Sequence, residues 1–186
     1  MELRYLQKRA EWESGKVIEA VGKEYGEKFG SSHVGLLESH RCEDAEVILV
    51  TMGIVYPVIK FAVNALRAKG VKVGCVKVRV FRPFPGRALW DLVKGSKVVV
   101  VVDRNALGAL YEEMQGAFYR YLDGGRGPLV MGRVLGIGGN AIPLLDIGHV
   151  VEEGLEAVKV GRVEKALDWY PIKGIDYDPT RDIIAE

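Results

Sequence analysis

From residue 46 to residue 160 the sequence alternates short apolar runs with longer segments of helical periodicity, and this alternation restricts the fold more than any other feature. The apolar runs are nearly continuous, which is typical of parallel strands that are covered on both faces. They occupy residues 46–53, 71–80, 97–103 and 128–136. Because strands alternate with helices through four rounds, we predict a mostly parallel open sheet with right-handed crossovers and helices on both faces.

Helical patterns fill the intervals between these strands. In residues 54–70 the apolar side chains share one stripe, Pro57 falls in the first turn, and Gly70 lies just past the end, as helix boundaries prefer. Another helix is predicted over about residues 108–122. The last helix is predicted over residues 147–160, with Asp146 as its N-cap.

The two ends of the chain depart from this alternation. We assign residues 1–45 to a helical arm or linker and an edge strand, and residues 46–160 to the α/β domain. Residues 161–186 carry two prolines and little periodicity, so we expect an irregular extension that packs on its own body or on a partner. A frayed terminus is the alternative.

The N-terminal arm is dense in charge and has apolar residues at helical spacing. We predict a helix, or a helix pair interrupted near Gly15 and Gly22, that lays one apolar stripe on the body. A short edge strand is predicted near residues 34–39. The predicted stripe consists of Val17, Ile18, Val21, Tyr25 and Phe29.

The overall charge and the cysteines exclude several classes of function. Formal net charge is +1 and the pI is near 7.7, so the basic footprint of a nucleic-acid partner is missing. The longest apolar run, residues 98–102, is too short to span a bilayer, and the N-terminus lacks the apolar core of a signal peptide. Cys42 and Cys75 lie in different segments, whereas an iron–sulfur cluster normally requires four thiolates. We expect a cytoplasmic protein with free thiols, no metal of its own, and no nucleic-acid or membrane partner.

Polar, glycine and aromatic residues gather where the predicted parallel strands end. Ligands of open α/β sheets collect outside the carboxyl ends of the strands. We therefore predict that ligand or partner contacts lie at this edge of the sheet. The candidate residues are Gly53, Arg79, Phe81, Arg82, Pro83, Phe84, Asp103, Arg104, Gly138, Gly139 and Asn140.

Two motifs at this edge allow a catalytic and a structural interpretation. Gly136, Gly138 and Ala141 have the spacing of a dinucleotide fingerprint, but they follow the last strand rather than the first, so a tight turn or contact surface is favoured. Asp103 and Arg104 are either a catalytic acid with an anion clamp or a mutual salt bridge that shapes the loop, and the structural use is favoured. The sequence shows no nucleophile with an assigned base, so we assign no catalytic residue.

The segment "FRPFP", residues 81–85, joins the second predicted strand to a helical pattern. Pro83 and Pro85 restrict its backbone, so Phe81 and Phe84 would be presented with little conformational entropy to lose. We expect a rigid docking turn whose neighbouring arginines contact an adjoining domain or an anionic ligand.

Four segments in order, "EDAEVILVTMG", "VGCVKVRVFRPFP", "VVVVVDRNALGALYEE" and "LGIGGNAIPLLDI", resemble the C-terminal part of the α subunit of the pyruvate synthase (pyruvate:ferredoxin oxidoreductase) family. The arm is similar to the linker that precedes this domain, so the resemblance covers about residues 2–160. Two loops depart from the family pattern. The loop after Asp103-Arg104 is short, and Asn140-Ala141 stands where the family commonly has Arg-Asp, so no binding role is carried over to either.

The resemblance implies the fold of the transketolase C-terminal domain. This is a three-layer α/β/α sandwich with a mostly parallel five-stranded sheet and one antiparallel strand, which would be the strand near residues 34–39. It also implies a whole enzyme that decarboxylates pyruvate oxidatively with coenzyme A and thiamine diphosphate and reduces ferredoxin through iron–sulfur clusters. Those cofactors belong to other domains and subunits, so the chain would be a structural docking component that is inactive alone.

Two other classes of function stay open on the sequence. The chain would serve as a free-standing binding module for coenzyme A or another small ligand, using the same strand ends. Alternatively it would be a homodimerising scaffold without an enzyme partner, since domains of this fold often pack in pairs. The docking component of a 2-oxoacid:ferredoxin oxidoreductase is the favoured hypothesis.

Overall fold

The structure is a computed structural model that describes residues 1–30, 35–122, 124–125 and 127–170 of the 186-residue chain. One sheet forms its centre, and the order of strands across the sheet is β1-β3-β2-β4-β5-β6. Its strands are β1 (Leu37–His40), β2 (Val47–Met52), β3 (Val73–Val78), β4 (Val98–Asp103), β5 (Leu129–Val134) and β6 (Leu167–Trp169). Strand β1 pairs with β3 in antiparallel fashion, and the other neighbours are parallel. The predicted mostly parallel sheet with one antiparallel edge strand is confirmed.

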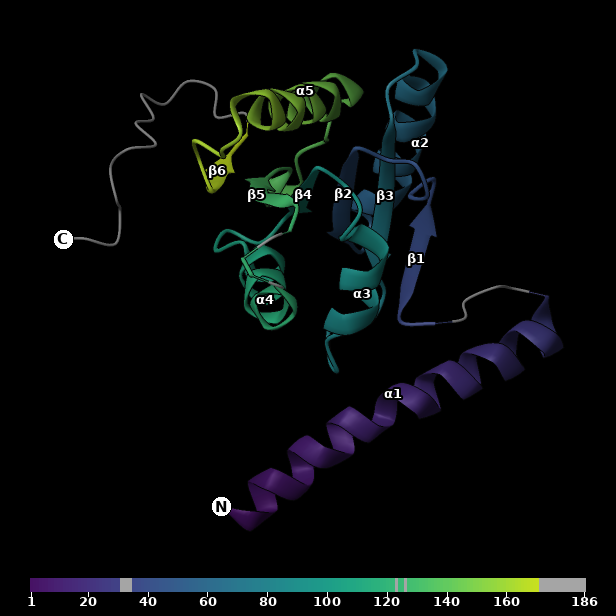
Figure 1. The fold of residues 1–186 in the computed structure, drawn as a ribbon. Coiled ribbons are helices and arrows are strands. Elements are labelled where there is room, and N and C mark those ends of the chain that lie inside the picture. Colours follow the sequence, from purple (N-terminus) through teal and green to yellow (C-terminus); the bar gives the residue numbers. More distant parts are fainter. Residues whose placement is uncertain (31–34, 123, 126, 171–186) are drawn as a thin grey trace.

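Helices cover both faces of this sheet, which confirms the three-layer sandwich (Figure 1). Helices α2 and α5 pack on one face, and α3 and α4 pack on the other. Strand β4 is buried throughout, and its alternate valines enter the two opposite core clusters. Its continuous apolar sequence is therefore a direct consequence of burial on both faces. The helices are α1 (Glu2–Phe29), α2 (Val55–Ala68), α3 (Gly86–Val93), α4 (Ala109–Phe118) and α5 (Leu144–Val160), with 3₁₀ turns η1 (Tyr119–Tyr121) and η2 (Ile137–Gly139).

The arm differs from its prediction in two respects. Helix α1 is continuous over 28 residues, so the predicted interruptions near Gly15 and Gly22 are wrong. Gly15 instead lies against the body, where a Cβ atom would make an ordinary van der Waals contact of 3.4 Å with Cγ of Pro83. The predicted apolar stripe does not rest on the body: Val17, Val21 and Phe29 are 61%, 57% and 68% exposed. Figure 1 shows α1 as a long rod beside the sandwich.

The C-terminal segment adds a strand that the sequence did not predict. The expectation of an irregular extension is wrong for β6, which pairs with β5 and makes six strands where the resemblance implied five. The physical cause is Leu167, whose side chain occupies the space that a Cβ would take at Gly108 or Gly132. Tyr170 then bonds through its hydroxyl to Nδ1 of His149 at 2.7 Å. Residues 171–186 of the predicted extension lie outside the described residues.

Smaller corrections concern element boundaries. Helix α5 begins at Leu144, with Pro143 at the N-cap, so Asp146 lies in the first turn rather than at the predicted N-cap. A carboxylate in the first turn still interacts favourably with the helix dipole. The predicted edge strand begins later, at Leu37, and residues 31–34 lie outside the described residues. Within the part of the chain that the structure describes, every helix is too short or too polar to cross a bilayer.

Candidate functional site

The parallel register brings the predicted site residues to one edge of the sheet. Met52 at the end of β2 is in register with Val78 of β3, and Asp103 at the end of β4 is in register with Val134 of β5. The loops that follow these four strands therefore leave the sheet side by side. The structure nevertheless divides the candidates into two groups, one around Asp103 and one around the turn at residues 81–85.

The first group is a pair of loops tied together by hydrogen bonds. The carboxylate of Asp103 is 5% exposed and accepts bonds from the backbone amides of Asn105, at 3.0 Å, and Leu110, at 2.8 Å. Nε of Arg104 donates to the carbonyl oxygen of Gly136 at 2.9 Å. The favoured structural use of both residues is thus supported by geometry, but each bonds to a different partner and the suggested mutual salt bridge is not the arrangement.

The glycine segment after β5 forms a tight turn. Gly136, Gly138 and Gly139 have φ angles of 68°, 69° and 82°, which residues with a Cβ rarely adopt. Helix α5 starts only after Pro143, so the segment does not open directly into a helix as a dinucleotide loop does. The tight-turn interpretation is confirmed. Gly53, Gly138, Gly139 and Asn140 are exposed, and their contact with a ligand or partner stays a prediction.

The second group is built on the turn that follows β3. The Phe81 and Phe84 rings pack edge to face with their centroids 5.9 Å apart. Both rings also pack against the core cluster beneath α3 and α4. Pro83 is buried, and the bond between Arg82 and Pro83 is cis. The guanidinium of Arg82 lies over the Phe81 ring at 4.3 Å and donates to Glu113 of α4 at 2.7 Å. The turn is thus fixed from several sides.

Arg79 contacts the opposite face of the sheet from Arg82. Its guanidinium donates to Glu38 of β1 at 2.6 Å, and Lys60 of α2 lies 3.5 Å from the same carboxylate. Burial opposes ionisation of Glu38, but the hydrogen bond and charge of Arg79, together with Lys60, outweigh it. The pKa of Glu38 therefore lies below its usual value. The two candidate arginines each hold a carboxylate of this chain and do not converge on one ligand position.

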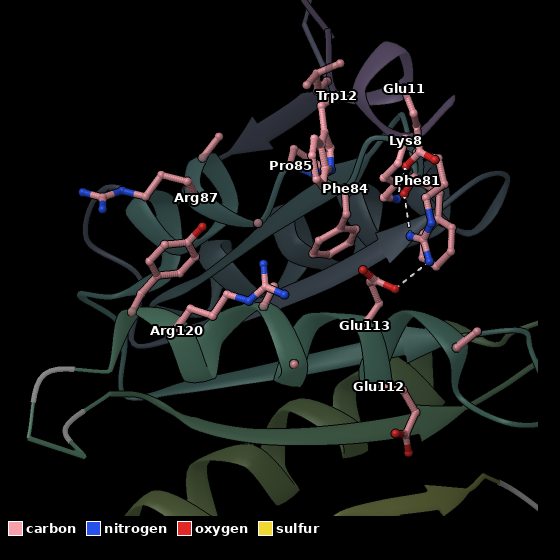
Figure 2. Close-up of a pocket in the computed structure, with 18 of the residues that line it drawn as sticks. Lys8, Glu11, Trp12, Phe81, Phe84, Pro85, Arg87, Glu112, Glu113 and Arg120 are labelled. Atoms are coloured by element: carbon pink, nitrogen blue, oxygen red, sulfur yellow. Dashed lines mark hydrogen bonds and ion pairs between the residues drawn. The ribbon is translucent and has the colours of Figure 1, made fainter. Parts of the chain in front are cut away.

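A groove of about 1000 Å³ runs beside the turn, and the sequence did not predict its other walls. Figure 2 shows Lys8, Glu11 and Trp12 of α1 on one side, with Glu113 and Arg120 on the other. The only local signal was the spacing of Lys8, Trp12 and Gly15, which places them on one face of a helix. The groove also includes Leu36, Phe81, Arg82, Phe84, Pro85, Gly86, Arg87, Ala88, Leu107, Ala109, Glu112, Gly116, Ala117 and Tyr121.

The thiols do not fit an iron–sulfur cluster. Cys42 and Cys75 are buried, and Sγ of Cys42 lies 3.4 Å from the carbonyl oxygen of Cys75. Burial raises the pKa of Cys42 to about 11 and that of Cys75 to about 12. Clusters are normally held by four thiolates, whereas this chain has two thiols and both are buried. Within residues 1–30, 35–122, 124–125 and 127–170, no cluster of His, Cys, Asp or Glu side chains could hold a metal ion.

The carboxylate at the strand edge is a poor ligand for a metal diphosphate. Such a ligand set needs carboxylate oxygens that are free to face the ion. Both oxygens of Asp103 already accept backbone amide bonds inside the fold. The strand-end loops of this chain therefore do not fit the diphosphate end of thiamine diphosphate through this residue.

Comparison with known protein families identifies the family of this domain. A model of the family described as pyruvate:ferredoxin oxidoreductase core domain II matches residues 45–147. The chain belongs to this family. The predicted resemblance to the α subunit of pyruvate synthase is confirmed.

Full-length relatives extend the match beyond the core domain. Ketoisovalerate oxidoreductase subunit VorA of Pyrococcus horikoshii is 36% identical over 176 residues, which are 92% of this chain and 44% of that subunit. Pyruvate synthase subunit PorA of Methanosarcina barkeri is 38% identical over 165 residues, which are 86% of this chain and 40% of that subunit. The chain thus spans less than half the length of these relatives, which are subunits of 2-oxoacid:ferredoxin oxidoreductases.

Solved structures agree on the fold. The 2-oxoglutarate:ferredoxin oxidoreductase from Magnetococcus marinus matches 71% of this chain and 21% of its own, with a TM-score of 0.52 at 22% identity. A split-gene transketolase matches 68% of this chain and 44% of its own, with a TM-score of 0.53 at 16% identity. The transketolase-like fold implied by the resemblance is therefore confirmed.

Proposed function

We propose that this chain is a structural docking domain of a 2-oxoacid:ferredoxin oxidoreductase and that other domains or subunits bind the thiamine diphosphate and iron–sulfur clusters. The observation that carries the proposal is the internal bonding of the strand edge in a member of this family. Asp103, Arg104 and Arg82 are engaged with groups of this chain. An edge whose charged groups are already bonded is suited to rigid recognition rather than to proton transfer.

The substrate class follows from the relatives, which are named for pyruvate and for ketoisovalerate. We propose a 2-oxo acid that is decarboxylated oxidatively to an acyl-coenzyme A, with pyruvate as the preferred substrate. The partners are the cofactor-bearing subunits, in a cytoplasmic complex whose reducing surroundings keep Cys42 and Cys75 as thiols. Ferredoxin reduction by the purified complex, assayed with pyruvate and with ketoisovalerate in parallel, tests the substrate.

Gentle native purification through a tag on this chain tests the docking role. The expected result is a complex that contains thiamine diphosphate, iron and acid-labile sulfide, while the isolated chain contains none of them. The isolated chain is also expected to show no turnover of pyruvate. Purification without any thiamine- or cluster-bearing subunit would overturn the proposal.

The turn at residues 81–85 is the proposed contact surface. Phe84→Ala is expected to weaken association with the other subunits by about tenfold, which corresponds to about 1.4 kcal/mol. Because Phe84 also leans on the core, the matched control is Val93→Ala, which truncates a fully buried side chain of the same core cluster. If Phe84→Ala lowers the melting temperature as much as Val93→Ala and leaves association intact, the turn is ordinary core.

The groove beside the turn favours a second candidate, a binding module for a small ligand. Its volume of about 1000 Å³ and its aromatic and arginine walls match the dimensions of a ligand pocket. The Magnetococcus marinus enzyme holds coenzyme A in its structure. Calorimetric titration of this chain with coenzyme A and with nucleotides distinguishes the candidates. Heat that saturates and is lost in Arg120→Ala supports the module, and a flat titration excludes it.

A further inference from the structure

Helix α1 carries an exposed row of large apolar side chains at intervals of four residues. We call Val17, Val21, Tyr25 and Phe29 the outer stripe. The rings of Tyr25 and Phe29 contact each other with centroids 4.7 Å apart. A shallow hollow of about 480 Å³ adjoins the stripe, lined by Val17, Ile18, Val21, Gly22 and Tyr25. An apolar row with an adjoining hollow is a surface that accepts side chains of another protein.

Val17 and Val21 of the outer stripe do not face the body of this chain. Gly15 is the buried residue of α1, and it faces Pro83 and Leu36. Val17 follows two residues later, which is about 200° around a helix of 3.6 residues per turn. Val21 lies about 240° around, so Val17 and Val21 point away from the side of α1 that meets Pro83. Tyr25 and Phe29 follow on the next two turns, further along the helix than that contact. The body alone leaves Val17 and Val21 61% and 57% exposed.

The charges of α1 indicate whether a membrane or a protein surface covers its outer stripe. Residues 2–29 contain six basic and six acidic side chains, so the helix is neutral. Several of these charges pair within the helix, as in Lys8 with Glu11, Arg9 with Glu13 and Lys28 with Glu24. Helices that lie on anionic membranes carry an excess of Lys and Arg on the polar face. A neutral apolar protein surface is the better match.

The lengths of the relatives indicate which protein surface this is. The core-domain family match begins at residue 45, after α1. The match to Pyrococcus horikoshii VorA nevertheless covers 92% of this chain, which leaves at most about 15 residues unmatched, and so it includes the part of α1 from Val17 to Phe29. The same match covers 44% of VorA, so that subunit holds an α1-like segment together with a larger part that has no counterpart in residues 1–186.

The area of the stripe disfavours a simple pair of two α1 helices. A 28-residue helix is about 42 Å long and about 10 Å wide. Two such helices side by side would bury roughly 800 Å² in total, whereas stable interfaces bury about 1,200–2,000 Å². A folded domain that surrounds the helix covers more of it.

We propose that the outer stripe of α1 docks onto the remaining, larger part of the oxidoreductase subunit, whether that part is joined to this chain or supplied separately. The inference rests on the proposed function and assigns to it a second contact surface, distinct from the turn at residues 81–85. The occupant is an uncharged apolar groove on a folded domain.

Site-specific photo-cross-linking in the cells that make this chain tests the proposal. Val21 is replaced by p-benzoylphenylalanine, and the matched control places the same group at Glu19, about 200° away on the helix. Peptide mass spectrometry is expected to find cross-links from position 21 to oxidoreductase sequence that has no counterpart in residues 1–186, at least fivefold above position 19. Equal yields at both positions, cross-links to a second copy of this chain, cross-links to lipid, or no cross-links at position 21 would each overturn it.

A second variant measures the strength of the contact. Val21→Glu is expected to reduce the amount of this remaining part that co-purifies with the tagged chain at least tenfold. Lys23→Glu introduces the same carboxylate on the other side of α1 and is expected to change it less than twofold. Because Val21 is exposed, the melting temperature of the chain checks that the body stays folded. Equal losses in both variants contradict the proposal.

The outcome is separable from that of the proposed function. If the tagged chain purifies with thiamine- and cluster-bearing subunits but position 21 forms no cross-link to the remaining part, the docking role stands and the stripe assignment fails. If those subunits are absent from the purified material, the proposed function itself fails.

Discussion

The body and the arm of this protein both contain apolar residues at regular spacing, but only the body buries them in a core. In the body, apolar side chains at helical and strand spacing enter two core clusters that sandwich the sheet. In α1, Val17, Val21 and Phe29 recur at equally regular spacing and are exposed, and one of the 28 residues of the helix is buried. Regular apolar spacing therefore predicts that a helix or strand packs against another apolar surface. It does not predict whether that surface belongs to the same chain.

The largest expected effect separates the two regions directly. Leu49→Ala removes a fully buried side chain from β2 and is expected to lower the free energy of unfolding by about 3 kcal/mol. Val21→Ala in the arm is expected to change it by less than about 0.5 kcal/mol, because the side chain is exposed. Chemical denaturation of the purified chain measures both. Comparable losses would mean that the arm is part of the cooperative core.

A second prediction concerns the polar edge of the body. Asp103→Ala leaves the backbone amides of Asn105 and Leu110 without their acceptor and is expected to destabilise the chain by about 2 kcal/mol. Arg104→Ala, one residue along the chain and exposed, is expected to cost about 1 kcal/mol or less. Thermal unfolding of both variants measures the two losses of stability. A larger loss in Arg104→Ala than in Asp103→Ala would contradict the structural role of Asp103.

The point where the arm meets the body offers a sharper test. Gly15→Leu introduces a side chain against Pro83 and is expected to displace α1 without altering the body. Gly15→Ala is the control, since it adds one carbon and favours the helix by up to about 1 kcal/mol. Spin-label distances between α1 and α3 measure the displacement. An unchanged distance in Gly15→Leu would show that this contact does not position the arm.

The smallest expected effect is the response of the edge strand to acid. The pKa of Glu38 is lowered in the folded state by Arg79 and Lys60, so its stabilising contribution is complete above the usual value of 4.5. It is lost as the pH falls below 4.5 through the lowered folded-state pKa. Unfolding at pH 7 and at pH 3.5 is expected to show a smaller loss of stability in Glu38→Gln than in the unmodified chain. An identical pH dependence in the two proteins would show that Glu38 does not contribute to the loss of stability in acid.

Local sequence was sufficient for the centre of the fold. Strands β2 and β4 were predictable because burial on both faces demands continuous apolar runs, and α2 was predictable from Pro57 and Gly70 at its ends. The convergence of the strand-end loops also followed, since parallel strands end at one edge. The family resemblance supplied the antiparallel direction of β1, which its own four residues do not encode.

The missed features depend on contacts between distant segments. Strand β6 exists because Leu167 fits beside Gly108 and Gly132, and nothing within its three residues signals that fit. The groove joins Trp12 to Phe84, which are far apart in the sequence, so no window of the sequence contains both. The separate partners of Asp103 and Arg104 likewise depend on where Leu110 and Gly136 lie.

The strands at the two margins of the sheet have a consequence for solubility. Strand β1 covers one margin and β6 covers the other, and neither falls within the family match of residues 45–147. A chain trimmed to that match would uncover the hydrogen-bonding edges of β3 and β5. Long apolar edges of this kind are templates for strand addition between molecules. The flanking segments thus cover both edges of the sheet, and we expect a chain trimmed to residues 45–147 to aggregate more readily than one that keeps β1 and β6.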